Sequence, residues 1–594
     1  MCFRRKVPIS KFDQPARGTH NRGKSKNMFF PQGPNSISAR PPNPNPPSQT
    51  STQPQKCDMT SQVVPLAPQN PSHLRLQENS LIMRTLLIVA MSLAMITTAA
   101  PAPADWLTDG GDPQRTGWQR NETILTKDNV KNLKVKWATK LDNEPREMHN
   151  LFAPMIVSNV PTKDGPKEIA IEAGSGDNVY GIDTANGKVL WKKHFPYTSD
   201  RPARLGGPLC PGGLVVTPTI GPPGPNGQRT AYSVSGDGMM HFLNVADGED
   251  LQPPANFMPA NGKAYSLNLN NNVLYTTTAQ GCGGNPNKIY SFDLATRKTA
   301  EYNPKGGGLW GRSGAAIGFD GTLYAPTGDG MYDAAQERYG NVIISTTPDL
   351  KYKDHYAPSN AAFLWKRDLD MQVTPAVFQY KGHEFLVSAC KECRIWLMDS
   401  KAIGGPDHRT PVHRTPLLCN EDVNFAAAGI WGSMATWEDE KGTRWILTSF
   451  WGPVHSQFKA PLSYGPVTRG AIVAHKLEEV NGKFVLTPAW ISHDMDMAEP
   501  PVIANGIVYA YGSGESNVQA TPEMGLGANT SAIRIKNSSR AIIYAYDGQT
   551  GKELWNSGEA IEKFVHFGAL SIANGHLYLG DFGGTLYSFG LEGK

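Results

Sequence analysis

The stretch Val179–Trp191 reads VYGIDTANGKVLW, and Ile543–Trp555 repeats it almost residue for residue as IYAYDGQTGKELW. In both copies, apolar residues alternate along a strand that ends in an aspartate, and a glycine turn leads to a second strand carrying a tryptophan. The alternation places apolar side chains on one strand face, and Asn-Gly or Thr-Gly supplies the positive φ of a tight hairpin. Because one small sheet cannot bury this face alone, the copies must stack.

Weaker copies of the same strand occur at 240–248, 289–296, 395–399 and 586–589. We count eight units, whose inner strands are predicted to begin near Leu151, Gly213, Leu267, Ser313, Thr374, Ser433, Pro501 and Gly568.

The last unit, 569–589, stops after its third strand, and Leu133–Ala138 near the other end of the repeat region offers the missing fourth strand with Trp137. The sequence therefore predicts an all-β, eight-bladed β-propeller of four-stranded antiparallel blades with docking tryptophans, in which an N-terminal strand closes the ring. A sandwich pair, an open array, or a ring of six or seven blades are the alternatives.

Composition agrees with a turn-rich β protein. Of 594 residues only 19% are charged, whereas 60 are glycine and 47 are proline, which favours short strands over long helices. The net charge of +4 is small for this length, so the chain carries no electrostatic footprint of a nucleic-acid partner.

The first part of the chain differs from the rest. Residues 1–82 show no apolar period and are expected to be a disordered leader or a misplaced upstream start. Met83-Arg84, an apolar run over 86–96 and small residues up to Ala104 predict a secretory signal peptide over 83–104. A buried helix or a membrane anchor is the alternative, although the run is short for a bilayer span. We therefore expect a periplasmic or secreted propeller over 105–594, with no membrane span in the mature chain.

The repeat VYGIDxxxGKxLW resembles that of the pyrroloquinoline-quinone (PQQ) dehydrogenases and their propeller relatives. The segments DWLTDGGD at 105–112 and NVKNLKVKW at 129–137 are also similar to the start of their mature chains. The resemblance implies an oxidoreductase that binds PQQ over a calcium ion on the propeller axis and oxidises a small organic substrate. The alternative, since propellers without catalysis share such repeats, is a protein-binding or assembly platform.

Two motifs of these dehydrogenases fall on one stretch of this chain. Their Gly-Thr-Gly-Asn motif, whose Asn is a calcium ligand, matches 326–329, so the resemblance makes Asp329 the candidate calcium ligand. At the place of their catalytic Asp, Gly340 is followed directly by Asn341, and an amide cannot take a proton from an alcohol. The vicinal cysteine pair and the Gly-Glu motif of those enzymes have no counterpart here.

The motif GLWGRS at 308–313 recurs as GIWGSM at 429–434, each time just before an inner strand. Trp310 and Trp431 are therefore predicted to face the channel and stack on a flat quinone, with Arg312 pairing a carboxylate. If so, these three residues and Asp329 should converge at one mouth of the channel. The alternative is two equivalent packing tryptophans.

Two acidic runs, RDLDMQVT at 367–374 and HDMDMAE at 493–499, also precede inner strands. They are either metal sites or repeat equivalents whose aspartates satisfy turn backbones. Glu147, Asn150 and His566 are candidates for the same channel end.

Five cysteines lie in 105–594, so at least one is unpaired within the chain. Cys390 and Cys393 have zinc or redox spacing, but they fall in a predicted hairpin turn, which indicates a cross-turn disulfide or two surface thiols. Cys210 and Cys282, in adjacent units, are a second candidate pair. The sequence has no Cys-x-x-Cys-His heme motif, so electrons would leave through another protein.

Overall fold

The computed structural model describes residues 102–196, 207–210, 212–214, 216–524 and 527–592. The predicted leader at 1–82 and nearly all of the predicted signal peptide lie outside the described residues. Across the ranges described, no helix is both long and apolar enough to cross a bilayer.

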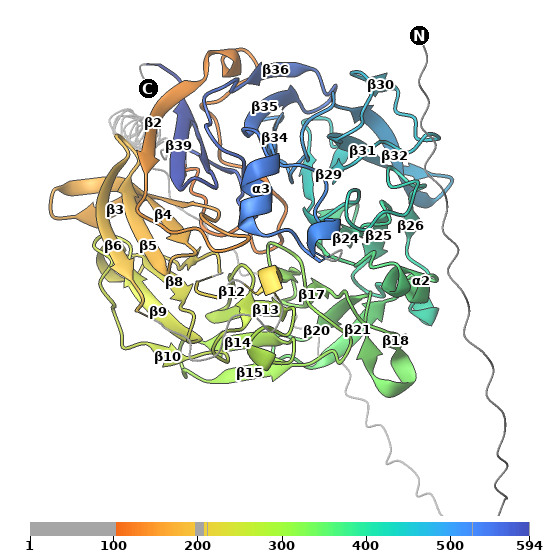
Figure 1. The fold of residues 1–594 in the computed structure, drawn as a ribbon, viewed down its shortest axis with the longest axis horizontal. Helices are drawn as coiled ribbons and strands as arrows, with labels where there is room; N and C mark the ends of the chain where they lie inside the picture. Colours follow the sequence, from red (N-terminus) through yellow and green to blue (C-terminus); the bar gives the residue numbers. More distant parts are fainter. Residues whose placement is uncertain (1–101, 197–206, 211, 215, 525–526, 593–594) are drawn as a thin grey trace, which may run out of the picture. The chain divides into compact units, whose positions relative to one another are not determined.

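The chain forms the predicted eight-bladed β-propeller, with small, mainly antiparallel sheets following one another around a ring (Figure 1). The first four blades run from the orange to the green part of the chain. Blade 1 contains β3 (Met155–Thr162), β4 (Gly165–Gly174), β5 (Asn178–Asp183) and β6 (Lys188–His194); blade 2 contains β7 (Thr219–Ile220), β8 (Thr230–Val234), β9 (Met239–Asn244) and β10 (Ala255–Asn256); blade 3 contains β11 (Lys263–Ala264), β12 (Asn268–Asn270), β13 (Val273–Ala279), β14 (Ile289–Asp293) and β15 (Thr299–Tyr302); blade 4 contains β16 (Ala316–Ile317), β17 (Leu323–Pro326), β20 (Ile343–Thr346) and β21 (Tyr352–Tyr356).

The remaining blades complete the ring. Blade 5 contains β23 (Ala376–Tyr380), β24 (His383–Ala389), β25 (Ile395–Asp399) and β26 (His413–Arg414); blade 6 contains β28 (Ala435–Glu438), β29 (Arg444–Trp451), β31 (Gly470–Val480), β32 (Lys483–Ile491) and β30 (Leu462–Ser463); blade 7 contains β1 (Trp118–Gln119), β33 (Val502–Ala504), β34 (Ile507–Gly512), β35 (Ile542–Asp547) and β36 (Glu553–Asn556); blade 8 contains β37 (Ser571–Ala573), β38 (His576–Gly580), β39 (Thr585–Gly590) and β2 (Lys134–Lys140). A parallel pair, β22 (Val373–Thr374) with β27 (Gly432–Ser433), links the lead-ins of blades 5 and 6, and β18 (Tyr332–Asp333) with β19 (Arg338–Tyr339) forms a separate hairpin.

Ring closure follows the prediction. Strand β2 pairs antiparallel with β39, and Trp137 lies opposite Ser588. Blade 8 therefore takes three strands from the C-terminal end and one from the N-terminal part of the repeat region. This closure leaves neither end of the repeat with an unpaired sheet edge.

Tryptophans of the repeat dock four of the blades on the next one. Four of them donate the indole N–H to a backbone carbonyl of the following blade: Trp137 to Thr184 (2.7 Å), Trp191 to Val245 (2.9 Å), Trp490 to Gly548 (3.0 Å) and Trp555 to Leu133 (3.1 Å). The turn glycine leaves room for the docked indole, because a Cβ on Gly551 would lie 2.6 Å from Trp490. Gly551 also has φ +73°, so one residue serves both the turn and the docking.

The longest connection within a described blade joins β34 to β35. Between Gly512 and Ile542 the chain leaves blade 7 and forms α3 (Ser531–Asn537), which lies near the middle of the ring in Figure 1. The other described α-helix, α2 (Ala361–Lys366), precedes blade 5.

Candidate functional site

A cavity of about 320 Å³ collects side chains from consecutive blades. Trp310 and Asp329 belong to the lead-in and loops of blade 4, Trp431 leads into blade 6, and Arg534 comes from α3 of blade 7. His566, in the lead-in to blade 8, also lines it. Because inner strands of a propeller converge on its axis, these contributions place the cavity at the axis.

Three of the four residues predicted to converge do line this cavity: Trp310, Asp329 and Trp431. Arg312 is not among its lining residues. Its Nη1 lies 3.5 Å from Asp109 Oδ1, and its Nη2 donates to Ser433 Oγ at 3.4 Å. The structure thus places Arg312 in an ion pair inside the protein. The ligand-binding roles of all four stay predictions.

Of the residues expected at the same channel end, His566 lines the cavity. Glu147 instead accepts a hydrogen bond from Ser531 N at 3.0 Å and so holds the start of α3. Asn150 donates to Phe582 O at 2.7 Å and is buried.

Three carboxylates meet at the cavity. Asp329, Asp368 and Asp370 each bring an oxygen within 4.8 Å of the others. Asp370 is buried, accepts a hydrogen bond from Asp329 N at 2.8 Å and pairs with Lys391 Nζ at 3.0 Å. Asp368 lies 3.7 Å from the same Nζ. We call this group the acidic trio.

The single positive charge of Lys391 does not balance the three carboxylates of the acidic trio. Burial, with repulsion from Asp370 and Asp368, raises the pKa of Asp329 to about 8. Asp329 is exposed to solvent, but the solvent that it contacts lies inside the cavity. The cavity walls shield the charge of its carboxylate less than bulk water would. Burial likewise raises the pKa of Asp368 to about 6. Burial alone would do the same to Asp370, but Lys391 and the Asp329 N–H outweigh it and lower that pKa.

The second acidic run has a different role. Asp494 accepts hydrogen bonds from the backbone N–H groups of Thr468 and Arg469, at 3.0 and 2.8 Å, and its other oxygen pairs with the Arg469 guanidinium. Asp496 also pairs with Arg469. These aspartates therefore satisfy a turn and an arginine, as the turn interpretation predicts, and the described residues bring no third carboxylate to them.

At the position of the missing base, Asn341 is fully buried and has φ 55°. Its Nδ2 donates to Gly330 O at 3.0 Å. Asn341 therefore holds the backbone of the loop that carries Asp329.

Aromatic side chains give the cavity flat apolar walls. Trp431 stacks on His566 with centroids 6.1 Å apart and meets Phe567 edge-on at 4.9 Å. The indole N–H groups of Trp310, Trp431 and Trp451 are buried and have no hydrogen-bond partner among the described residues. Such walls with a few polar groups are typical of sites for planar organic ligands.

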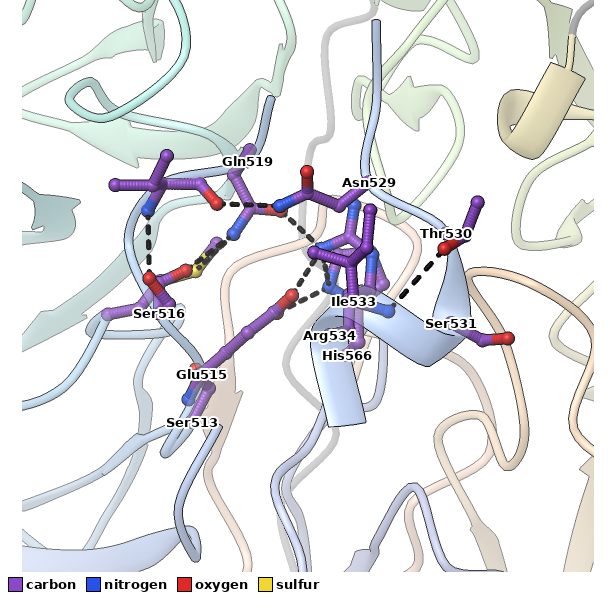
Figure 2. Close-up of polar contacts among 12 residues, drawn as sticks. Ser513, Glu515, Ser516, Gln519, Asn529, Thr530, Ser531, Ile533, Arg534 and His566 are labelled. Carbon is purple, nitrogen blue, oxygen red and sulfur yellow. Dashed lines mark hydrogen bonds and ion pairs between the residues drawn. The ribbon is translucent and has the colours of Figure 1, made fainter. Parts of the chain in front are cut away.

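A charged network of residues from blades 7 and 8 borders the cavity, and Figure 2 shows its polar contacts. Arg534 Nη1 contacts Glu515 Oε1 and Gln519 Oε1, and His566 Nδ1 lies 2.6 Å from Glu515 Oε2. Against the effect of burial, His566 and Arg534 lower the pKa of Glu515 to about 2. Burial, reinforced by Arg534, lowers the pKa of His566 to about 4, so the imidazole is neutral near pH 7.

The predicted bond between Cys390 and Cys393 is wrong. Cys393 is bonded to Cys419, and Cys390 is a buried free thiol, not a surface one. The reason is that Leu418 N donates to Cys393 O at 2.9 Å. This hydrogen bond brings the chain before blade 6 alongside the turn, with the two Cα atoms 5.3 Å apart. The second candidate pair, Cys210 and Cys282, is bonded.

Sequence reasoning missed two parts of the site. It left the run of Asp368 and Asp370 between two interpretations and gave no role to Lys391, because their meeting with Asp329 depends on the path of the loops. It also missed Arg534 and Glu515. The signal for these was the interval between the strands ending at Gly512 and starting at Ile542, which is the longest between strands that follow one another in the chain within a described blade.

No protein-family model and no curated protein matches the chain. Among solved structures, the quinohemoprotein alcohol dehydrogenase of Comamonas testosteroni is 16% identical with a TM-score of 0.52, covering 84% of this chain and 82% of that chain. A europium-containing methanol dehydrogenase is 13% identical with a TM-score of 0.54, covering 82% and 98%. The quinohemoprotein alcohol dehydrogenase ADHIIG of Pseudomonas putida HK5 is 13% identical with a TM-score of 0.53, covering 83% and 81%. At these identities the similarity shows the fold: the chain has the propeller fold of quinoprotein alcohol and methanol dehydrogenases.

Proposed function

We propose that the axial cavity binds PQQ together with a hard cation, and that the chain is an oxidoreductase passing electrons from a small organic substrate to that cofactor. One observation carries the proposal. In a fold shared with quinoprotein dehydrogenases, the acidic trio and the tryptophans Trp310 and Trp431 line the same cavity.

The acidic trio suits a hard cation because carboxylate oxygens are the ligands that such ions prefer. Asp370, held by Lys391 and by the Asp329 N–H, would be the fixed ligand, with Asp329 and Asp368 supplying further oxygens. The raised pKa values of the latter two indicate excess negative charge, which a cation would relieve. Calcium fits this donor set, and so does a trivalent lanthanide such as the europium named for one structural neighbour.

The tryptophan walls suit a flat cofactor. Trp310 and Trp431 offer ring faces to this cavity, and their N–H groups have no hydrogen-bond partner among the described residues. When bound, PQQ supplies a quinone that accepts two electrons from an organic substrate. Because Asn341 donates to Gly330 O and cannot accept a proton, a carboxylate oxygen of Asp329 or Asp368 that does not ligate the cation would take a substrate hydroxyl proton.

The cation half of the proposal is tested with terbium, whose luminescence rises when a nearby tryptophan transfers energy to it. The protein should show saturable Tb³⁺ luminescence that Ca²⁺ or La³⁺ competes away. Asp370→Asn should weaken binding by about tenfold or more, because it removes the fixed ligand. Asp496→Asn is the matched control, since Asp496 pairs with Arg469 on the equivalent run. Equal binding by both variants would overturn the cation site.

The cofactor half is tested by titrating PQQ into the cation-loaded protein by calorimetry and measuring dye reduction over a panel of alcohols and aldoses. We expect saturable binding that Trp431→Ala weakens, followed by turnover of at least one substrate. Binding without turnover would favour a sensor or an assembly platform, and no binding would overturn the quinoprotein proposal.

We also propose that the propeller is exported to the periplasm or secreted. The two disulfides, Cys210–Cys282 and Cys393–Cys419, support this location, because such bonds persist in oxidising compartments. Fractionation of cells expressing the full chain should place a shortened protein outside the cytoplasm; an unprocessed cytoplasmic product would contradict export.

A further inference from the structure

One buried lysine beside the cavity has no ion pair with any described carboxylate. Lys263 is 3% exposed, and its Nζ has no hydrogen-bond partner among the described residues. The surroundings of Nζ are aromatic, with the Phe567 ring centroid at 5.4 Å and the Tyr265 ring centroid at 5.9 Å. A buried ammonium group without an anionic partner is costly, so its presence calls for a counter-charge.

The carboxylate beside Arg534 is already occupied. Glu515 uses one oxygen for Arg534 Nη1 and the other for His566 Nδ1. Arg534 is 2% exposed, and its Nε lacks a hydrogen-bond partner in the described part of the chain. Glu515 therefore balances the charge of Arg534, and no carboxylate of the described residues forms an ion pair with Lys263.

Nearby aromatic and imidazole groups complete this wall. His149 is 3% exposed, and neither of its ring nitrogens has a partner within the described ranges. It packs on Phe567 with centroids 5.0 Å apart. We call Lys263, Arg534, His149, His566 and Phe567 the basic wall.

The basic wall borders the cavity. Arg534, His566 and Phe567 line the cavity directly, and Lys263 and His149 lie against Phe567. Phe567 has φ 57°, a left-handed conformation that a bulky side chain rarely adopts. Such strain persists only where the surroundings impose it, and it clusters at ligand sites.

We propose that the basic wall is a carboxylate-binding site, so that the organic ligand of this cavity is an anion held by Arg534 and Lys263. A carboxylate would supply the missing counter-charge and accept the free donors, as charge-assisted hydrogen bonds require. This inference deepens the proposed function by assigning the charge of the ligand. The carboxylate belongs either to the cofactor or to an acidic substrate such as a hydroxy acid. Competition between a small carboxylate and PQQ distinguishes these two sources.

The test uses oxalate, a small dicarboxylate, with dimethyl oxalate as its uncharged match. Calorimetry on the disulfide-bonded protein should show saturable oxalate binding and none for the ester. Lys263→Met should weaken oxalate binding by about ten- to a hundredfold, the range for one charged hydrogen bond. Lys188→Met, an exposed lysine of blade 1, should bind like the parent. Lys263→Met removes an uncompensated charge, so we expect this variant to fold. Its unfolding midpoint checks that a loss of oxalate binding does not come from misfolding.

The outcomes separate this site from the proposed cofactor. If oxalate binds through Lys263 and PQQ displaces it, the cofactor supplies the carboxylate; if oxalate binds equally well beside PQQ, an acidic substrate supplies it. If oxalate binds through Lys263 while PQQ does not bind, the basic wall stands and the quinoprotein proposal fails. Oxalate binding that is absent, or unchanged in Lys263→Met, would overturn the basic wall as a carboxylate site.

Discussion

Replacing Lys263 by methionine should stabilise the protein, and the gain should depend on pH. Methionine keeps the length of the side chain in an aromatic pocket but removes the charge. In the folded chain, burial, reinforced by the charge of Arg534, lowers the pKa of Lys263 from 10.5 to about 7. The folded lysine therefore releases a proton at a pH where the unfolded lysine keeps it.

The size of the effect follows from these two pKa values. One pKa unit corresponds to about 1.4 kcal/mol, so at pH 7 the uncompensated lysine costs roughly 4 kcal/mol. At pH 9.5 the unfolded lysine is itself approaching its pKa, and the cost falls to about 1 kcal/mol by the same relation. Between pH 7 and 10.5 the unfolded chain binds more protons than the folded one, so this lysine makes the parent protein more stable as pH rises.

The assay is urea unfolding of the disulfide-bonded protein, followed by tryptophan fluorescence in buffers free of carboxylates. Parent, Lys263→Met and Lys188→Met are compared at pH 7 and pH 9.5. We expect Lys263→Met to have the highest midpoint at pH 7 and to approach the parent at pH 9.5, with Lys188→Met matching the parent at both. An advantage that does not change with pH, or a variant less stable than the parent at pH 7, would refute the uncompensated charge and remove the main argument for the basic wall.

Three further perturbations test the frame of the molecule. Trp490→Phe removes the indole N–H bound to Gly548 O and part of a buried ring, so calorimetric or urea unfolding should show a loss of about 1–3 kcal/mol; an unchanged stability would mean that docking does not hold the blades. Replacing Cys210 and Cys282 by serine opens a link between residues 72 apart and should lower the free energy of unfolding by about 4 kcal/mol, whereas a loss below about 1 kcal/mol would show that the unfolded chain is not constrained there. Glu499 is fully buried, and neither of its oxygens has a partner among the residues described; burial raises its pKa well above 4.5, so above that pH its contribution makes the parent less stable as pH rises. Glu499→Gln should therefore stabilise the protein more at pH 8 than at pH 5, and a gain that shrinks with rising pH would contradict this.

Much of the fold could be predicted because short-range sequence patterns determine its strands and turns. Alternating apolar residues define the strands, and Asn-Gly or Thr-Gly defines the turns. The tryptophan four residues after the turn glycine defines the docking contact. Even the closure could be predicted, because the last unit lacks a fourth strand and Trp137 occupies the matching position of an isolated strand. The strand, turn and docking signals each lie within about a dozen residues, where local geometry decides the outcome.

The site depended on the tertiary structure because its groups share no local pattern. Asp329 and Asp370 meet because loops of neighbouring blades converge at the axis, and Arg534 reaches the cavity because an insertion folds back over the ring. Likewise, Cys393 pairs with Cys419 because the chain returns beside the turn, whereas spacing alone pointed to Cys390. Sequence by itself determined the repeating frame, since each blade is built from neighbouring residues. Which charges face one another across the axis was decided only when eight blades closed into one ring.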